Sequence, residues 1–311
     1  MSSRMRIRVP GSTSNLGPGF DSIGLAVDRF LELDLVPADE WRFFGQTHEL
    51  QDLPSGKDNF IFEIAHAVAH AYGVHLDQYP HHVSVYSDIP LARGLGSSAS
   101  AIVAAIELAN NIGNLQLTIE EKLRVASLRE GHIDNVAASL YGGLIVGSHR
   151  EDATELVQID LHEVAFVAII PAYELQTAAS RKSLVPSYDR YEAVKASAIA
   201  NTLVAALCTK NWVLAGKMME KDHFHEQARA HLVPELNQAR SWAKDYGAYG
   251  TFLSGAGPTV FIMTDSNQAH ALCEKATQQF PEAECAIIRP SSYGVQVYTG
   301  AETPRYQQSI K

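Results

Sequence analysis

The stretch that decides the fold reads Ile89-Pro90-Leu91-Ala92-Arg93-Gly94-Leu95-Gly96-Ser97-Ser98-Ala99-Ser100. Residues 82–89 before the turn alternate apolar and polar side chains, which predicts a half-buried strand. After the turn, Ile102, Ile106 and Ala109 stand at helical spacing. We therefore expect a strand, a turn with two glycines and two hydroxyls, and then a helix.

This turn has the chemistry of an anion site. Glycine lets the backbone approach a ligand closely, and the free N–H groups and positive dipole end of the helix point into the turn. Phosphate is the natural ligand, and a plain tight connection is the alternative. Gly94, Gly96 and Ala99 also match the G-x-G-x-x-[GA] pattern of dinucleotide sites, but that interpretation needs a second strand ending in Asp or Glu about 20 residues on. Residues 117–122 instead have the pattern of a helix start, and no G-x-x-x-x-G-K-[ST] segment occurs.

Composition and charge narrow the class of protein. With 311 residues the chain is long enough for one large or two ordinary domains. The net charge of −10 and the absence of a Lys/Arg cluster argue against a nucleic-acid partner. The longest apolar run, residues 164–171, is too short to span a bilayer, and the three cysteines have no paired spacing. We expect a cytoplasmic protein without a membrane partner.

Periodicity predicts an α+β protein whose two domains, 1–160 and 161–311, pack closely. We expect a short strand at 7–9, an ordered loop at 10–21, and further strands at 24–35, 142–147, 155–159, 165–170, 249–253, 260–264, 283–288 and 295–298. Helices are expected at 58–72, 99–110, 118–130, 190–208, 211–224, 234–246 and 268–280.

A polar cluster ends the helix predicted at 118–130. It reads Glu130-Gly131-His132-Ile133-Asp134-Asn135-Val136-Ala137, with four chemically active side chains within six residues. A surface capping loop is the alternative interpretation, since helix caps and Asx turns also use Gly and Asp.

Four stretches together resemble the GHMP small-molecule kinases. Residues 90–100 resemble the P-x-x-x-G-L-G-S-S-A phosphate loop of that family, and residues 254–259 (SGAGPT) resemble its third motif. Residues 15–21 (NLGPGFD) and 130–137 are similar to segments of the homoserine-phosphorylating branch. The resemblance runs over nearly the whole chain, with the motifs in order.

The resemblance implies a fold and an activity. The fold would be a two-domain GHMP kinase fold, with a ribosomal-protein-type α+β domain first and a ferredoxin-like domain second. The activity would be ATP-dependent phosphorylation of the L-homoserine hydroxyl to O-phospho-L-homoserine, a step toward threonine. Another kinase of the family, or a non-catalytic sensor of ATP or an amino acid on the same fold, is the alternative. The family often dimerises, which implies a homodimer.

By resemblance, residues 90–100 bind ATP, with Gly94, Gly96, Ser97 and Ser98 around the phosphates. The Ser98 hydroxyl and the Glu130 carboxylate would hold Mg²⁺, a hard ion that prefers oxygen ligands. The implied substrate-binding residues are Asn15, Asp21, Thr177, Arg181, Arg229 and Gly255.

Homoserine is a zwitterion with a hydroxyl, so its site needs partners of both charges. The resemblance places Asp21 at the ammonium or hydroxyl, Asn15 at a polar contact nearby, and Arg181 and Arg229 at the carboxylate. Arginine suits this role because its planar fork binds a carboxylate with two parallel hydrogen bonds.

The catalytic residues implied are His132, Asp134 and Asn135. Asp134 would act as general base, as an aspartate does in mevalonate kinases, or His132 and Asn135 would only orient the hydroxyl. We favour the second interpretation because an alcohol loses its proton late in a loose transition state. The chain departs from the family pattern at Ile133 and Ala138, where prolines are usual, and at Ser100, where alanine is common; these changes affect loop stiffness.

Overall fold

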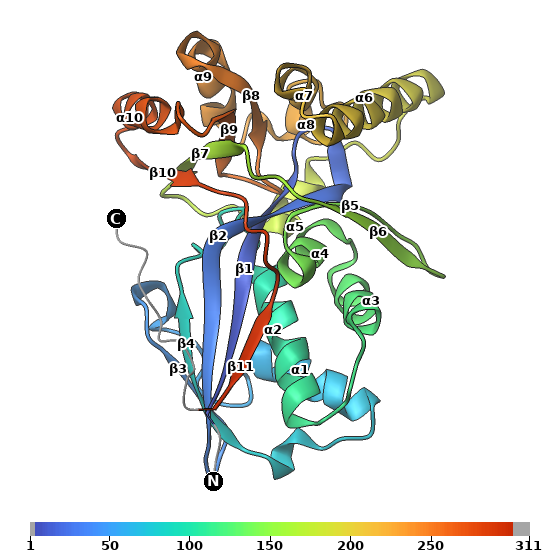
Figure 1. The fold of residues 1–311 in the computed structure, drawn as a ribbon, viewed down its shortest axis with the longest axis vertical. Helices are drawn as coiled ribbons and strands as arrows, with labels where there is room; N and C mark the ends of the chain where they lie inside the picture. Colours follow the sequence, from blue (N-terminus) through green and yellow to red (C-terminus); the bar gives the residue numbers. More distant parts are fainter. Residues whose placement is uncertain (1–3, 301–311) are drawn as a thin grey trace.

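The computed structural model describes residues 4–300, which form two α+β units stacked end to end (Figure 1). Each unit is a β-sheet with helices packed against it, which confirms the α+β class predicted from the sequence. Within residues 4–300, none of the helices combines the length and the apolar character needed to cross a membrane.

The first unit is a sheet with its helices on one face (Figure 1). Its strands are β1 (Met5–Asn15), β2 (Gly19–Pro37), β3 (Arg42–Gly45), β4 (His81–Ser87), β5 (Leu144–His149), β6 (Thr154–Ile159) and β11 (Gln296–Thr299). The strand order is β11-β1-β2-β4-β3, and β5 pairs with β2 and β6. The helices are α1 (Phe60–Ala71), α2 (Ser97–Ile112), α3 (Ile119–Glu130) and α4 (Asp134–Tyr141). Short 3₁₀ turns cover His48–Leu50 and Leu76–Gln78.

The second unit is a four-stranded antiparallel sheet in the order β10-β7-β9-β8. Its strands are β7 (Val164–Pro171), β8 (Ala248–Leu253), β9 (Val260–Asp265) and β10 (Ala283–Ile288). Its helices are α5 (Thr177–Lys182), α6 (Arg190–Cys208), α7 (Trp212–Met219), α8 (Glu226–Arg229), α9 (Pro234–Trp242), α10 (Ala269–Gln279) and the 3₁₀ turn Ala243–Tyr246.

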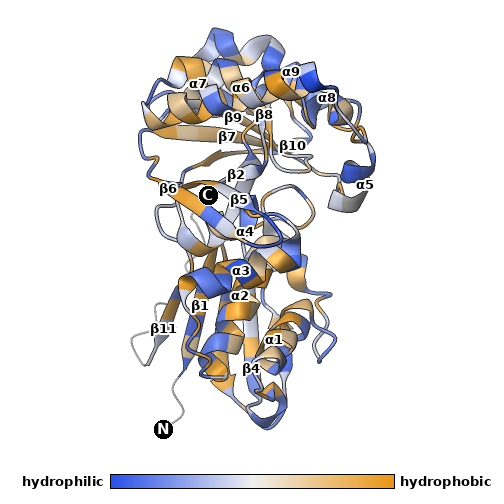
Figure 2. Cartoon of the chain, turned by 90° about the vertical axis from the view of Figure 1, so that its right-hand side faces the viewer, coloured by the Kyte–Doolittle hydropathy of each residue, from blue (hydrophilic) through white to orange (hydrophobic). Residues whose placement is uncertain are grey.

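Strand β7 shows why the apolar run in the sequence is continuous. Phe166 and Ala168 point into one hydrophobic core, whereas Val167 and Ile169 point into a second core on the other face of the sheet. A strand buried on both faces has no polar side to alternate with. Figure 2 shows β7 as an apolar strand beneath helices that mix polar and apolar residues.

The first difference from the sequence prediction lies in residues 10–21. Instead of a loop, β1 continues to Asn15 and pairs with β2, with register shifts between Pro10 and Gly11 and between Ser14 and Asn15. The long partner strand supplies hydrogen bonds across these irregularities, so the segment stays in the sheet despite its glycine and proline. Helix α7 also ends earlier, at Met219, than the predicted helix 211–224.

The second difference concerns the last strand. Residues 295–298 were expected to complete the second domain, but β11 pairs antiparallel with β1, with Met5 opposite Thr299. Pairing with β11 covers the edge of β1. The predicted division at residue 160 therefore separates the two sheets except for this strand, and the end of the predicted second domain, beyond residue 300, lies outside the described residues.

Candidate active site

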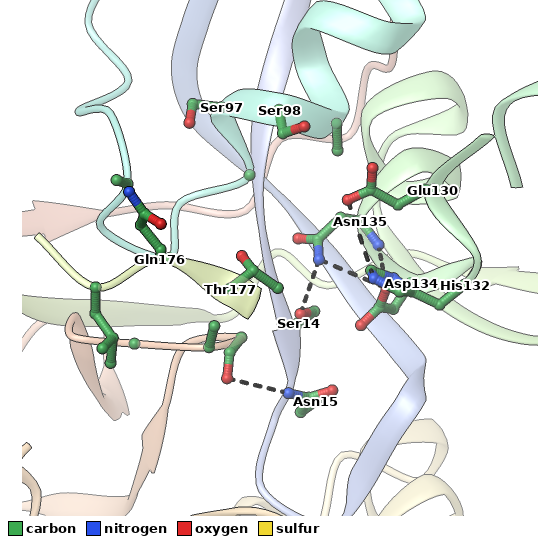
Figure 3. Close-up of a pocket in the computed structure, with 18 of the residues that line it drawn as sticks. Ser14, Asn15, Ser97, Ser98, Glu130, His132, Asp134, Asn135, Gln176 and Thr177 are labelled. Atoms are coloured by element: carbon green, nitrogen blue, oxygen red, sulfur yellow. Dashed lines mark hydrogen bonds and ion pairs between the residues drawn. The ribbon is translucent and has the colours of Figure 1, made fainter. Parts of the chain in front are cut away.

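A cavity of about 310 Å³ is lined by residues of both units. Figure 3 shows Ser97 and Ser98 at one end, Gln176 and Thr177 on one side, and the polar cluster of residues 130–135 on the other. The structure thus brings segments far apart in the sequence to one place. The lining includes the following sequence-predicted residues: Asn15, Ala92, Gly94, Gly96, Ser97, Ser98, Ala99, Glu130, His132, Asp134, Asn135, Thr177, Arg229 and Gly255.

The start of α2 gives the cavity an anion-binding end. Helix α2 begins at Ser97, and its cap residue Gly96 has a φ of 72° and no side chain to accept a hydrogen bond. The first N–H groups of the helix therefore keep their capacity to bind a ligand, and the positive end of the helix dipole adds to it. This geometry suits phosphate.

The loop before α2 is held tightly against the second unit. Gly94 has a φ of 78°, and a Cβ there would lie 2.4 Å from the carbonyl oxygen of Ser254. The Ser254 hydroxyl donates to the Gly94 carbonyl at 2.5 Å, and the Thr259 N–H donates to the Arg93 carbonyl at 3.3 Å. A larger residue than glycine does not fit at position 94 without moving backbone.

Arg93 does not point into the cavity. Its guanidinium donates to the carbonyls of Leu91, Pro171 and Ala172 at 2.7, 3.1 and 2.7 Å. The side chain therefore links the loop to the end of β7, and it is not free to bind phosphate.

The junction between α3 and α4 presents the polar cluster. Gly131 takes the left-handed conformation, with a φ of 87°, and ends α3 directly after Glu130. Helix α4 starts at Asp134, and the tight turn between the two helices directs the side chains of Glu130, His132 and Asp134 to the same cavity (Figure 3). The cluster therefore lines the cavity between the two units, which distinguishes it from a capping loop on the open surface.

His132 and Asp134 form a charged pair. The Nδ1 atom of His132 lies 2.6 Å from Oδ1 of Asp134. Burial lowers the pKa of His132, but the hydrogen bond and charge of Asp134 outweigh burial and raise it overall. Burial raises the pKa of Asp134, and the hydrogen bond and charge of His132 bring it below its usual value. The pair is an imidazolium and a carboxylate at moderately acid pH.

Asn135 is held by β1. Its side-chain amide donates to the Ser14 hydroxyl at 3.0 Å, and its carbonyl accepts from the Ser12 hydroxyl at 2.9 Å. Its backbone N–H donates to Asp134 at 2.8 Å. The backbone N–H of Asn135 therefore orients Asp134, and its side-chain amide joins α4 to β1.

Of the carboxylates of Asp21, Glu130 and Asp134, that of Glu130 has the longest ion pair. Burial raises the pKa of its carboxyl group, with the charge of His132 opposing this effect. Among the described residues it makes one ion pair, at 4.0 Å to Nε2 of His132. A partly buried carboxylate with so distant a partner, facing the same cavity as the Ser98 hydroxyl, fits an oxygen-binding cation such as Mg²⁺.

A second acidic group is less suited to a metal ion. Ligand-type atoms of Asp21, His132 and Asp134 lie within 4.8 Å of one another. His132 and Asp134 are bonded to each other, however, and Asp21 is paired with Arg181. Glu130 is therefore the better candidate for a cation ligand in this region.

Asp21 and Arg181, expected to contact the substrate separately, bind each other. Arg181 donates to the two oxygens of Asp21 at 2.7 and 3.1 Å, and its guanidinium lies 5.5 Å from the centre of the Phe20 ring. Asn15 holds the backbone of this turn, since its Oδ1 accepts from the Asp21 N–H at 3.1 Å. Its amide also donates to the Gly255 carbonyl at 3.3 Å.

Arg229 is a buried cation at the cavity. Its Nη1 donates to Nδ1 of His225 and to the Gly255 carbonyl, each at 3.0 Å. Its Nε is buried without a hydrogen-bond partner among the described residues. Burial, with the charge of Arg181, lowers its pKa to about 10. A buried guanidinium with an unused donor suits an anionic ligand.

Several residues of this region are not predicted from the sequence. Ser14, Phe20 and Gln176 line the cavity, and Ser12 and His225 hold lining residues in place. The run of hydroxyls at residues 12–14 was a usable signal, because a buried strand rarely carries three. His225, four residues before Arg229, had no signal of its own.

Comparisons with known proteins agree with one another. Residues 59–143 match the model of the GHMP kinases N terminal domain, and residues 203–282 match that of the GHMP kinases C terminal domain. The chain is 49% identical to the homoserine kinase of Bacillus velezensis over 93% of each chain. It is 43% identical to that of Halalkalibacterium halodurans over 96% of each chain. It is also similar to the crystal structure of homoserine kinase from Cytophaga hutchinsonii, with 26% identity, a TM-score of 0.83 and coverage of 95% of this chain and 97% of that one.

The His132–Asp134 pair predicts a pH dependence of stability. Because the folded pKa of His132 lies above 6.5, its contribution is fully present below about pH 6.5 and is lost as the pH rises through the raised value. We expect His132→Gln to lower the thermal midpoint most near about pH 6 and less at about pH 9. A cycle with Asp134→Asn isolates the pair. If the loss in thermal midpoint caused by His132→Gln grows toward alkaline pH, the assignment of a charged His132–Asp134 pair is wrong.

Proposed function

Since the chain belongs to the GHMP kinase family, we propose that it is a homoserine kinase, which transfers a phosphoryl group from ATP to the hydroxyl of L-homoserine. The product is O-phospho-L-homoserine. The observation that carries the proposal is one cavity with a helix N-terminus at one end and the buried Arg229 in its wall. The first suits a nucleotide phosphate, and the second suits the carboxylate of an amino acid.

The start of α2 is the proposed phosphate site. The N–H groups of Ser97, Ser98 and Ala99 bind the transferred phosphoryl group and its neighbour, and the pinned loop at Gly94 keeps them in place. Phosphoryl transfer requires mainly positioning and neutralisation of charge, which a rigid loop and a helix dipole supply.

Ser98 and Glu130 are the proposed Mg²⁺ ligands. Both line the cavity, and the one ion pair that Glu130 makes among the described residues is the 4.0 Å pair with His132. The ion, when bound, neutralises phosphate charge and screens the nucleotide from the acidic side chains. The protein contributes two oxygens from different helices, the beginning of α2 and the end of α3.

The Asp21–Arg181 pair is suited to a zwitterion. Homoserine carries one ammonium and one carboxylate. When it binds between the two side chains, its ammonium replaces Arg181 as the partner of Asp21, and its carboxylate replaces Asp21 as the partner of Arg181, so both side chains keep an opposite charge. In this proposal the ammonium binds Asp21, and the carboxylate binds Arg181 and the guanidinium of Arg229, which lines the cavity. Asn15, Thr177 and Gly255 complete the pocket.

The state of Asp134 favours a mechanism without a strong base. Its pKa is lowered by His132, and its Oδ1 also accepts from the Asn135 N–H. A carboxylate stabilised in this way has a weak affinity for a further proton. We therefore propose that His132, Asp134 and Asn135 orient the hydroxyl, which loses its proton late in the transfer.

Two alternatives are less well supported. A non-catalytic sensor is expected to lack Ser98 or Glu130, and both line the cavity. The second alternative is a family member that acts on a sugar. A sugar such as galactose has no carboxylate to bind Arg229, so the burial of this arginine with a donor that has no partner among the described residues would be unexplained.

A substrate profile tests the proposed function. We expect phosphorylation of homoserine, measured by coupled ADP release, at least about 100-fold more efficient than that of mevalonate, galactose or shikimate, because a missing charged partner costs several kcal/mol. ADP release without acceptor is the control. Equal or greater efficiency with one of the other acceptors overturns the proposal.

The proposed cation ligand predicts the effect of Glu130→Gln. The amide keeps the shape and loses the charge, so we expect kcat to fall at least about tenfold, equivalent to about 1.4 kcal/mol of transition-state stabilisation. The Mg²⁺ concentration for half-maximal rate should rise. Glu120→Gln, at the exposed start of the same helix, is the matched control. An unchanged Mg²⁺ dependence removes Glu130 from the ligand set.

The proposed carboxylate contact predicts the effect of Arg229→Lys. Lysine keeps the charge but has no planar fork, so we expect the KM for homoserine to rise at least about tenfold. The KM for ATP should change by less than about threefold. Equal increases for both substrates would show that Arg229 supports the fold and does not bind the carboxylate.

A further inference from the structure

A fully buried histidine lies beside Arg229. His225 immediately precedes α8, and Arg229 is the last residue of that helix. The Nδ1 atom of His225 is 3.0 Å from Nη1 of Arg229, and its Nε2 atom is 2.9 Å from the carbonyl oxygen of Gly17. His225 has no exposed surface and lies outside the cavity lining, so it does not reach the ligand itself.

The two partners determine the protonation of the ring. A guanidinium donates and cannot accept, so Nδ1 of His225 is the acceptor for Arg229. A carbonyl oxygen accepts and cannot donate, so Nε2 carries the hydrogen and donates to Gly17. The neutral Nε2–H tautomer satisfies both bonds, whereas an imidazolium would set a donor against Arg229. Burial lowers the pKa of His225 to about 4, in agreement with a neutral ring.

The backbone of His225 is fixed independently of its ring. Oδ2 of Asp222 accepts from the N–H groups of His225 and Glu226, each at 2.7 Å, and Oδ1 accepts from Phe224 at 3.0 Å. The imidazole therefore projects from a backbone segment that Asp222 holds in place. The fixed ring in turn restricts the positions of Arg229 and Gly17, which its two nitrogens bind.

The turn on the other side of the ring is the one that carries Asp21. A Cβ at Gly17 would lie 2.0 Å from the carbonyl oxygen of Met219, so this turn is pressed against the end of α7. The next aromatic residue, Phe20, stacks on His225 with ring centres 5.3 Å apart and planes 20° apart. The guanidinium of Arg229 lies 5.6 Å from the centre of the same Phe20 ring.

We propose that His225 is a positioning residue that sets the Arg229 guanidinium and the 17–21 turn in a fixed relation to each other. This inference rests on the proposed function, which gives Arg229 a carboxylate and Asp21 an ammonium to bind. Both groups belong to one small substrate, so their relative placement decides its affinity. A histidine fits the position because a rigid ring offers an acceptor and a donor in two directions.

Three substitutions separate the two bonds. His225→Asn keeps an acceptor near the Nδ1 position, His225→Gln keeps a donor near the Nε2 position, and His225→Phe keeps only the ring that stacks on Phe20. We expect His225→Phe to raise the KM for homoserine at least about tenfold, while kcat and the KM for ATP change less than about threefold. His225→Asn should lie closest to wild type, because the carboxylate contact passes through Arg229.

The matched control is His223→Asn. This histidine is on the same segment, but its Nδ1 pairs with Glu192 at 3.0 Å, away from the cavity. We expect its KM values to equal those of wild type. If His225 is needed only for packing, its replacement lowers the thermal midpoint and leaves the KM for homoserine, measured below that midpoint, unchanged. This result overturns the inference. Equal increases in both KM values overturn it as well. If His225→Phe does not fold, the order of the Asn and Gln variants decides.

Nitrogen NMR of the wild-type protein tests the same link without catalysis. We expect an unprotonated Nδ1 and a protonated Nε2 on His225 at neutral pH, and an Arg229 Nε signal that moves in His225→Gln but not in His225→Asn. A protonated Nδ1 overturns the inference. If the wild-type protein phosphorylates no homoserine, the proposed function fails, and these signals still decide whether His225 orients Arg229.

Discussion

The hydroxyl of Ser254 donates to the Gly94 carbonyl at 2.5 Å and lies 2.7 Å from the hydroxyl of Thr13. One side chain of the second unit is thus hydrogen-bonded both to the loop before α2 and to β1. The Gly255 N–H donates to the Ser14 carbonyl at 3.3 Å, and the Ser12 N–H donates to the Leu95 carbonyl at 3.1 Å. The wall of the site depends on this contact, because it joins the loop, the strand and the second unit through a single side chain.

Charge in the cavity is balanced locally, although the chain as a whole carries −10. Of the carboxylates grouped here, Asp134 is neutralised by His132 and Asp21 by Arg181. Glu130 has a longer ion pair, at 4.0 Å to His132, and burial raises its pKa. In the proposed mechanism an anionic nucleotide meets a helix N-terminus and one weakly paired carboxylate, which explains why a divalent cation belongs in that mechanism.

Local features of the sequence predicted the start of α2 and the cluster at residues 130–135, because glycine turns and helix caps depend on near neighbours. The course of residues 10–15 could not be predicted in this way, since pairing with β2 overrides a composition typical of loops. The bond between Asp21 and Arg181 joins residues far apart in the chain, and only the packing of the two units brings them together. The burial of His225 has the same origin.

The return of β11 to the edge of β1 has a consequence for biosynthesis. The ribosome releases β1 before the second unit and β11 after it, so the first sheet keeps an open edge while the second unit is translated. An open edge strand is a template for pairing with other chains. The nascent chain is therefore exposed to misassembly during this interval, until β11 pairs with β1 and closes the edge of the first sheet.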